Sequence, residues 1–170
     1  VDYIAEHLNP TGRAAIIVPE GVVFQSQTAY KNLRRMLVDE GYLYGVISLP
    51  SGVFNPYSGV KTSILLIDKT LAKTKDSILF VKLNNDGRDL GAQRREIDGS
   101  EIPDVINTFK DYQDGKDVSG QKNVVLTLKS EVAKQDHILV GERYVKKVDK
   151  ISTYPVVQLE SLLEKFKVPD

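Results

Sequence analysis

The sequence predicts an α/β fold, and three observations carry the prediction. An apolar run at residues 13–19, an amphipathic segment at 28–40 and a second apolar run at 42–50 follow one another as strand, helix and strand. Such a unit is normally a right-handed crossover between parallel strands. Only about ten residues then separate the second run from the next one, at 60–69, which is too few for a helical crossover. That third strand should return antiparallel, as a hairpin partner.

The first strand, RAAIIVP, follows the turn signal Asn9-Pro10-Thr11-Gly12 and stops at Pro19. A short continuous apolar run predicts a strand buried on both faces, as parallel strands are. The residues that end it, Pro19-Glu20-Gly21, should lie at the carboxyl edge of the sheet, where sites in α/β folds lie. Glu20 is therefore a candidate for lining a site.

The helix expected at residues 28–40 has an apolar stripe and a natural end. Gly41 is well placed as its C-terminal stop. Arg34 and Arg35 are interpreted as a solvated helix face, with contact to DNA or a partner as the alternative. The stripe consists of Ala29, Leu33, Met36 and Leu37.

Beyond Lys69 the pattern weakens. Residues 70–77 read as a polar connection, 78–83 as a strand, and the turn-rich stretch that follows as a loop. A helix is expected at 101–113. A short apolar run at 124–128 then precedes a mixed helix or loop region, so that a smaller mixed α/β extension follows the main sheet.

Composition excludes several classes of protein. The chain has 170 residues, of which 41% are hydrophobic, enough to bury a core. Its 23 basic and 23 acidic residues cancel, which argues against nucleic-acid binding by bulk charge alone. It has no cysteine, and His7 and His137 alone cannot build a zinc centre, so no metal site is expected. No apolar run reaches the roughly 20 residues that cross a bilayer, and a cytosolic protein without membrane contact is the default.

Motifs of self-contained enzymes are missing. The sequence contains no GxGxxG, GxxxxGK[ST], HExxH or GxSxG pattern. Asn55-Pro56-Tyr57 approaches the Asn-Pro-Pro-aromatic signature of amino-group methyltransferases but lacks its second proline, and Asn9-Pro10-Thr11 fails similarly. We therefore expect no catalytic residue, no cofactor-binding residue and no metal ligand in this chain.

Three segments in one order resemble the N6-adenine DNA methylase family, specifically the modification subunits of type I restriction systems and related fused enzymes. They are GRAAIIVPEGVVF, LRRMLVDEG and GVISLPSGVFNPYSGVKTSILLIDK. The resemblance is dense over residues 8–69 and weaker over 78–112. It implies the last strands of a Rossmann-like methyltransferase sheet that ends in an antiparallel hairpin. The earlier half of that sheet, which binds S-adenosylmethionine and bears the catalytic motif, would precede this chain.

The resemblance also implies substrate-binding residues. Leu49-Pro50-Ser51-Gly52-Val53-Phe54 matches the motif whose phenylalanine packs against the extruded adenine. A base that undergoes chemistry must leave the stack, and an aromatic face offsets part of the lost stacking. The alternative is that Phe54 only caps the core. Lys61 and Thr62 match the family's Val-Lys-Thr, where a lysine contacts phosphate or the pocket rim, or else protects an edge strand. Pro50, Phe54, Lys61 and Thr62 are the candidate site for the flipped adenine and DNA.

The end of the chain, YPVVQLESLLEKF, resembles the opening of a type I specificity domain. The predicted organisation is then the C-terminal part of the methyltransferase domain at 1–100, a helical or mixed extension at 101–153 and the start of a specificity domain at 154–170. The expected function is part of an S-adenosylmethionine-dependent DNA adenine-N6 methyltransferase, inactive as this chain alone. Its expected partners are DNA, a specificity subunit or fused specificity domain, and a restriction subunit.

Two alternatives stay open. The chain is a non-catalytic assembly module that contacts a specificity subunit and DNA through residues 101–170, or it belongs to an RNA or protein methylase built on the same sheet.

Overall fold

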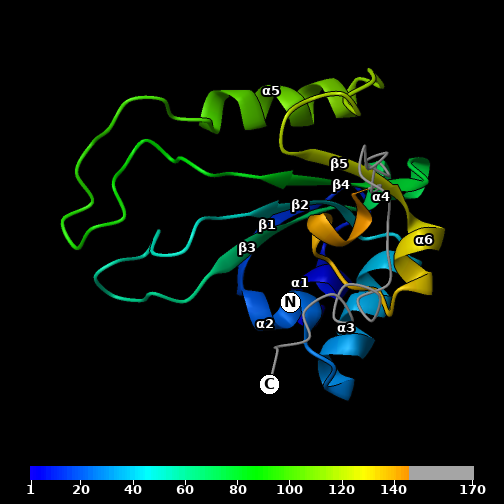
Figure 1. The fold of residues 1–170 in the computed structure, drawn as a ribbon. Coiled ribbons are helices and arrows are strands. Elements are labelled where there is room, and N and C mark those ends of the chain that lie inside the picture. Colours follow the sequence, from blue (N-terminus) through cyan, green and yellow to red (C-terminus); the bar gives the residue numbers. More distant parts are fainter. Residues whose placement is uncertain (146–170) are drawn as a thin grey trace, which may run out of the picture.

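The computed structural model describes residues 1–145, which form a five-stranded mixed sheet with helices on both faces (Figure 1). The predicted α/β class is confirmed. The strands are β1 (Arg13–Pro19), β2 (Leu43–Ser48), β3 (Thr62–Asp68), β4 (Ser77–Lys82) and β5 (Val124–Leu128). The helices are α1 (Asp2–His7), α2 (Glu20–Phe24), α3 (Thr28–Asp39), α4 (Lys69–Thr74), α5 (Ile102–Gln113) and α6 (Lys129–Lys134), and a 3-10 turn spans Gly141–Tyr144.

The strand order, β1-β3-β2-β4-β5, confirms the hairpin and refines its position. β3 pairs antiparallel with β2, as the short connection predicts, and also antiparallel with β1. The reversed strand thus lies between the two strands that the α3 crossover joins. β4 extends the sheet parallel to β2, and β5 pairs antiparallel with β4. The carboxyl ends of β1, β2 and β4 consequently share one edge of the sheet.

The prediction that residues 13–19 are buried on both faces is wrong for the part of the chain that the structure describes. β1 pairs there only with β3 and forms one edge of the sheet. Its exposure alternates along the strand, and the Ile17 side chain is 53% exposed. Continuous apolar character predicts two-sided burial only where both faces have neighbours to cover them.

α3 begins and ends close to where the sequence places it, with Gly41 in a left-handed conformation (φ +72°) just after its last turn. The interpretation of Arg34 as solvated is wrong. Its side chain is 0% exposed, whereas Arg35 is exposed as expected. The guanidinium is buried because backbone carbonyl oxygens surround it, an arrangement that the local sequence does not encode.

Residues 70–77 are also not simply a polar connection, because α4 (Lys69–Thr74) covers the first five of them. Asp68 caps this helix, since its Oδ1 accepts a hydrogen bond from the Leu71 backbone N–H at 2.8 Å. Ala72 of α4 is buried against the sheet. The Asp68 cap and the packing of Leu71 and Ala72 on the sheet hold this short helix in a segment that is otherwise polar.

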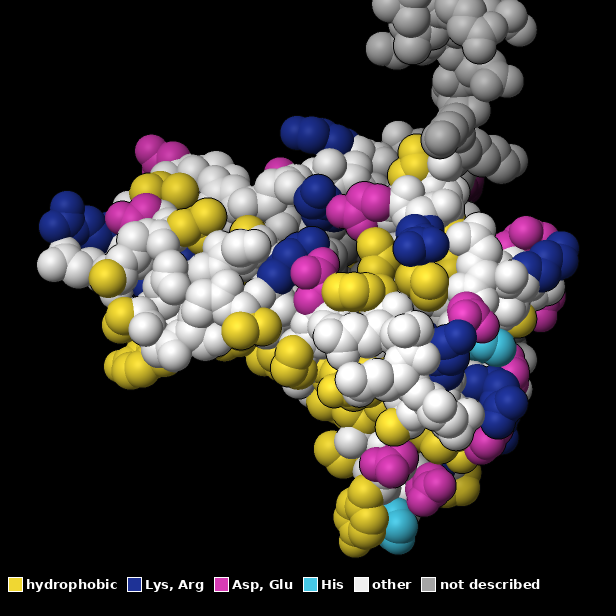
Figure 2. Space-filling model, turned by 60° about the horizontal axis from the view of Figure 1, so that its bottom comes forward, with side chains coloured by type: hydrophobic (Ala, Val, Ile, Leu, Met, Phe, Trp, Pro, Cys, Tyr) yellow, Lys and Arg dark blue, Asp and Glu magenta, His cyan; other side chains and the backbone are white. Residues whose placement is uncertain are grey.

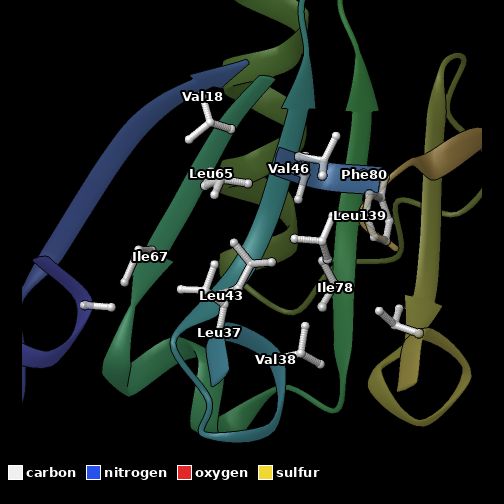
Figure 3. Packing of buried hydrophobic residues seen from close by; sticks show 13 residues of the cluster. Val18, Leu37, Val38, Leu43, Val46, Leu65, Ile67, Ile78, Phe80 and Leu139 are labelled. Carbon is white, nitrogen blue, oxygen red and sulfur yellow. The ribbon is translucent and has the colours of Figure 1, made fainter. Parts of the chain in front are cut away.

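Two hydrophobic clusters cover the two faces of the sheet. One lies beneath α1, α2, α3 and α6, and its side chains from four strands point to the same side (Figure 3). The other lies beneath α4 and α5 and includes Phe109 and Tyr112. We call these the α3 face and the α5 face. The labelled α3-face residues in Figure 3 are Val18, Leu37, Val38, Leu43, Val46, Leu65, Ile67, Ile78, Phe80 and Leu139.

The contact between β2 and α5 leads to a first prediction. A Cβ added at Gly45 would lie 2.4 Å from Cε1 of Phe109, too close without movement of strand or helix. Gly45→Ala should lower the free energy of unfolding by about 1–3 kcal/mol through overpacking. Gly59→Ala is the matched control, because nothing lies within 4 Å of its added Cβ. Urea unfolding of both variants measures the difference, and equal stabilities would contradict the close packing.

The predicted boundaries at residues 100 and 153 stay predictions. The specificity-like segment 154–170 lies outside the described residues.

Candidate functional site

Two long loops extend from the edge of the sheet where β2 and β4 end (Figure 1). The β2–β3 loop, residues 49–61, contains Pro50, Phe54 and Lys61. The β4–α5 loop, residues 83–101, follows the end of the parallel neighbour of β2. Together the two loops project from the sheet, and this part of the surface exposes hydrophobic side chains together with acidic and basic ones (Figure 2). The structure thus places most of the predicted site at the carboxyl edge, where ligands of α/β sheets bind.

Phe54 lies at a tight turn within the β2–β3 loop. Its carbonyl oxygen accepts hydrogen bonds from the N–H groups of Tyr57 and Ser58, at 2.9 and 3.0 Å. Its side chain is half-buried and packs at the margin of the α5-face cluster. Tyr57, by contrast, is 95% exposed. Phe54 is therefore partly anchored by packing while part of its ring remains accessible.

The base of the loop joins three strands. The Leu49 N–H donates to the Thr62 carbonyl oxygen at 3.0 Å, and the Glu20 N–H donates to the Lys61 carbonyl oxygen at 2.9 Å. The Lys61 Nζ lies 2.6 Å from Oε1 of Glu20, with both side chains about one-third exposed. The predicted phosphate-binding lysine is thus paired with the carboxylate that the sequence analysis also places at this edge.

Thr62 begins β3 and is only 8% exposed, yet its hydroxyl has no hydrogen-bond partner among the described residues. Side chains of a strand alternate between the two faces. Ile64 and Leu66 belong to the α5 face, so Thr62 lies on the α5 face with Phe54. Lys61, in contrast, pairs with Glu20 of α2, on the α3 face. The structure therefore brings Phe54 and Thr62 to one face of the sheet and Lys61 to the other.

The β4–α5 loop is braced by its own side chains. Glu101 Oε2 accepts a hydrogen bond from the Asn84 N–H at 2.7 Å, which closes the loop at its base. Arg94 pairs with Asp86, and its Nη1 also donates to the Asp89 carbonyl oxygen at 2.7 Å. A second ion pair, Arg88 with Glu96 at 3.1 Å, lies across the same loop.

A cavity of about 660 Å³ lies on the α3 face beside this edge, between β2, β4, β5 and the segment 139–145. Its volume lies within the range of small-molecule pockets, and its base is apolar. Glu20 lies at its rim, as do Lys82 and Glu142, whose charged groups are 3.2 Å apart. None of Pro50, Phe54, Lys61 and Thr62 lines it. The predicted site and the cavity are thus separate features of one edge.

Burial and pairing set the protonation of the groups that line this cavity. Burial raises the pKa of the Tyr144 hydroxyl to about 12, and that hydroxyl donates to the Ile138 carbonyl oxygen at 2.5 Å. Burial also opposes ionisation of Glu142, but hydrogen bonds from its own backbone N–H and from Lys82 keep its pKa below the usual value. Both groups therefore hold one protonation state near neutral pH, Tyr144 neutral and Glu142 charged.

Sequence reasoning missed the Arg34 site, the bracing of the β4–α5 loop and the cavity. A signal for the bracing exists, because Asp86 and Arg94, like Arg88 and Glu96, are opposite charges eight residues apart in a turn-rich stretch. No comparable signal exists for Arg34 or the cavity, since distant segments form both.

Residues 1–145 contain no group of three His, Cys, Asp or Glu side chains placed to hold a metal ion. No helix in that range is long and apolar enough to cross a membrane.

The mixed sheet with helices on both faces is compatible with a methyltransferase domain, and comparison with protein families identifies the class. A model of the family "N-6 DNA Methylase" matches residues 1–152, so the chain belongs to that family. The chain is 42% identical over 66 residues to the type I restriction enzyme EcoEI methylase subunit of Escherichia coli, across 39% of this chain and 13% of the relative. It is 39% identical over 69 residues to the EcoKI methylase subunit of Escherichia coli K12. That match covers 41% of this chain and 13% of the relative.

Solved structures support the same fold. The chain is similar, with a TM-score of 0.64 and 26% identity, to a type I restriction-modification system methyltransferase subunit from Streptococcus thermophilus, over 82% of this chain and 28% of that one. A second structure, whose subject is the complex assembly and conformational transition of a type I R-M system, is similar with a TM-score of 0.67 and 23% identity. The match covers 96% of this chain and 35% of that one. The chain thus spans about an eighth of the curated relatives and about a third or less of these structures.

Proposed function

We propose that this chain is the later part of a site-specific DNA adenine-N6 methyltransferase of the type I restriction-modification class. In this proposal it supplies one wall of the pocket that receives the extruded adenine, while the rest of the pocket comes from sequence that precedes it. The observation that carries the proposal is the position of the LPSGVF segment, on the loop between β2 and β3 at the carboxyl edge of the sheet.

Phe54 is the proposed contact to the base. Methylation of an adenine amino group requires that the base leave the duplex, and an aromatic face recovers part of the stacking that is lost. The Phe54 side chain is partly exposed and packs at the margin of the α5-face cluster, which would let it present a fixed surface. Pro50 stiffens the start of the same loop, because its ring fixes one backbone angle.

Lys61 and Thr62 complete the proposed wall in different ways. The ion pair with Glu20 neutralises Lys61 and ties the start of β3 to α2, so its proposed role is to hold the base of the loop. The Thr62 hydroxyl, buried and without a partner among the described residues, is available to a substrate group.

S-adenosylmethionine is the proposed methyl donor, and the connection from β1 into α2 does not fit it. α2 begins at Glu20, directly after β1, and its glycine, Gly21, faces the Gln25 side chain, whose Cδ would lie 2.9 Å from an added Cβ. That turn leaves no open backbone cradle for a nucleoside. We therefore assign none of these residues to the cofactor and derive no step through it.

The proposal is tested by comparing this chain with the full-length polypeptide that carries it. Methyl transfer from labelled S-adenosylmethionine to DNA should require the full-length polypeptide together with a specificity subunit or domain, and residues 1–170 alone should be inactive. RNA and protein substrates run in parallel separate the proposed function from its alternatives. Robust turnover by residues 1–170 alone, or transfer to RNA in place of DNA, would contradict it.

Thr62→Val tests the free hydroxyl. Valine has the same shape without the unpaired polar group, so the free energy of unfolding should stay the same or rise by about 1 kcal/mol. Methyl transfer should fall roughly fivefold if that hydroxyl bonds the substrate. Thr108→Val is the matched control: its hydroxyl lies within hydrogen-bond distance of Asp104 O, at 2.9 Å, and of Gln121 Oε1, at 2.5 Å, and donates its one proton between them, so this variant should lose stability. Unchanged transfer in Thr62→Val would remove Thr62 from the site.

The second candidate function, assembly with a specificity subunit, is favoured by one feature of α5. Ile102 and Ile106, one turn apart, are both exposed on its outer side. We propose that this pair contributes to contact with a specificity subunit. A pull-down with Ile102→Ser/Ile106→Ser in the full-length polypeptide tests this, and undiminished capture would argue against it.

A further inference from the structure

We propose that Asn55 is a positioning residue that joins the β2–β3 loop to the β4–α5 loop and thereby fixes Phe54 for the extruded base. The inference rests on the proposed function and deepens it. Asn55 directly follows Phe54, and its Nδ2 donates a hydrogen bond to the Leu90 carbonyl oxygen at 2.7 Å. The same asparagine belongs to the Asn55-Pro56-Tyr57 near-match, which the sequence analysis sets aside as a catalytic motif.

This hydrogen bond is the polar link between the loop and the rest of the molecule, beside the apolar packing of Val53 and Phe54 on the α5-face cluster. Among the residues described, it is the one hydrogen bond that ties residues 50–60 to another segment. The other bonds of that stretch are internal, such as Asn55 N–H to Gly52 O at 3.0 Å and Val60 N–H to Ser58 Oγ at 3.2 Å. Internal bonds shape the turn but do not fix it to a neighbouring segment, and the packing of Phe54 on the α5-face cluster has no directional requirement of its own. Asn55 is therefore the polar contact that sets where the turn, and Phe54 with it, lies.

The acceptor is held firmly. Leu90 lies between residues whose backbone is fixed by side chains of the same loop. Arg94 binds the Asp89 carbonyl oxygen, and the Gly91 N–H donates to Asp89 Oδ1 at 3.0 Å. A loop that is braced internally offers the Asn55 amide an acceptor at a fixed place, so the hydrogen bond transmits that rigidity to the neighbouring loop.

Gly52 makes room for this contact. Its φ of +84° lies in the region that favours glycine, and a Cβ there would be 2.7 Å from Asn55 Nδ2. Any larger residue would strain the turn and displace the amide. The glycine and the asparagine of the GVFN segment therefore act together to bring the two loops into contact.

The test uses the full-length polypeptide with its specificity partner and two DNA substrates. DNA with adenine at the target gives kcat and KM for methyl transfer, and DNA with 2-aminopurine at that position, which has no 6-amino group to methylate, reports extrusion of the base by fluorescence. Loss of one neutral hydrogen bond corresponds to a change of roughly five- to tenfold in the rate or equilibrium that depends on it. For Asn55→Ala we expect kcat to fall by about that factor and the 2-aminopurine fluorescence on binding to fall with it, while KM for DNA stays within about twofold. Asn55→Asp sets a carboxylate against the Leu90 carbonyl oxygen. Its kcat and its 2-aminopurine fluorescence should fall by at least the same factor.

Asn107→Ala and Asn107→Asp are the matched controls, because Asn107 is an exposed asparagine on α5, outside both loops. They should leave kcat, KM and fluorescence unchanged. Wild-type kcat and fluorescence in both Asn55 variants would overturn the inference, as would a loss of activity that follows melting temperature with unchanged fluorescence. An inactive wild-type enzyme would instead overturn the proposed function, and the role of Asn55 with it.

Discussion

Replacing Arg34 by alanine should lower the free energy of unfolding by about 3–5 kcal/mol, because it leaves several buried carbonyl oxygens without a donor and opens a cavity. The Arg34 guanidinium donates to the carbonyl oxygens of Val22, Gln25 and His137, each at 3.0 Å. A longer contact of 3.5 Å reaches Asp136 O. These carbonyls belong to α2, the α2–α3 connection and the turn after α6. One side chain therefore joins three segments that no strand pairing connects.

The charge of Arg34 is itself costly to bury. Burial lowers the pKa of the guanidinium, and the nearby Asp136 carboxylate opposes that shift. Asp136 is in turn paired with Lys31 at 2.5 Å on the surface of α3. The carbonyl oxygens compensate Arg34 mainly as hydrogen-bond acceptors, so a residue without donors cannot replace it.

Arg35→Ala is the matched control, since it removes the same side chain from the neighbouring, exposed position. Its effect should stay within about 0.5 kcal/mol. Urea unfolding gives the global change, and hydrogen exchange shows whether α2 and the turn at 135–138 lose protection first. Arg34→Met separates the loss of hydrogen-bond donors from the opening of a cavity, because methionine keeps much of the side-chain volume but has no donor. Equal stabilities of the Arg34 and Arg35 variants would refute the role of these hydrogen bonds.

Phe54→Ala should lower methyl transfer by the full-length enzyme roughly fivefold to 150-fold, the range expected from the loss of one base–aromatic stacking contact of about 1–3 kcal/mol. Because Phe54 is only half-buried and lies at the margin of the α5-face cluster, its removal should cost less stability than the loss of a fully buried phenylalanine, about 1–2 kcal/mol. The two effects separate the proposed base contact from a purely structural role.

Two further variants sharpen this prediction. Phe54→Tyr keeps an aromatic face and should retain most activity, whereas Phe54→Leu keeps apolar packing and should not. Phe24→Ala is the control, because Phe24 is an exposed phenylalanine at the end of α2, away from the loop. A stability loss of about 3 kcal/mol or more in Phe54→Ala, with activity lost in proportion, would mean that Phe54 belongs to the core.

Part of this architecture could be predicted because it depends on local pattern and chain length. The period of residues 28–40 predicts α3, and Gly41 marks its end. The short connection after β2 allows only an antiparallel return, and β3 follows it. The run at 78–83 and the helix at 101–113 are likewise present as β4 and α5, within one residue at each end.

The predictions that were wrong concern β1 and α4, and both depend on tertiary neighbours that cannot be identified from the sequence. Hydrophobicity alone cannot show that, within residues 1–145, β1 has a strand on only one side, because an apolar run can form an edge strand as well as a central one. α4 has too few apolar residues for a periodic pattern, and its cap on Asp68 and the burial of Ala72 become visible only against the sheet.

For the candidate site, the sequence by itself determined the loop and its chemistry: the turn residues, Phe54, and the family to which LPSGVF points. Only the tertiary structure decided how these residues are divided and held. It placed Lys61 against Glu20, left the Thr62 hydroxyl without a described partner, buried Arg34 among carbonyl oxygens and joined Asn55 to Leu90. Each of these depends on a contact between residues far apart in the chain. The sequence shows which polar, charged and aromatic side chains are present, but only the fold determines which of them come into contact.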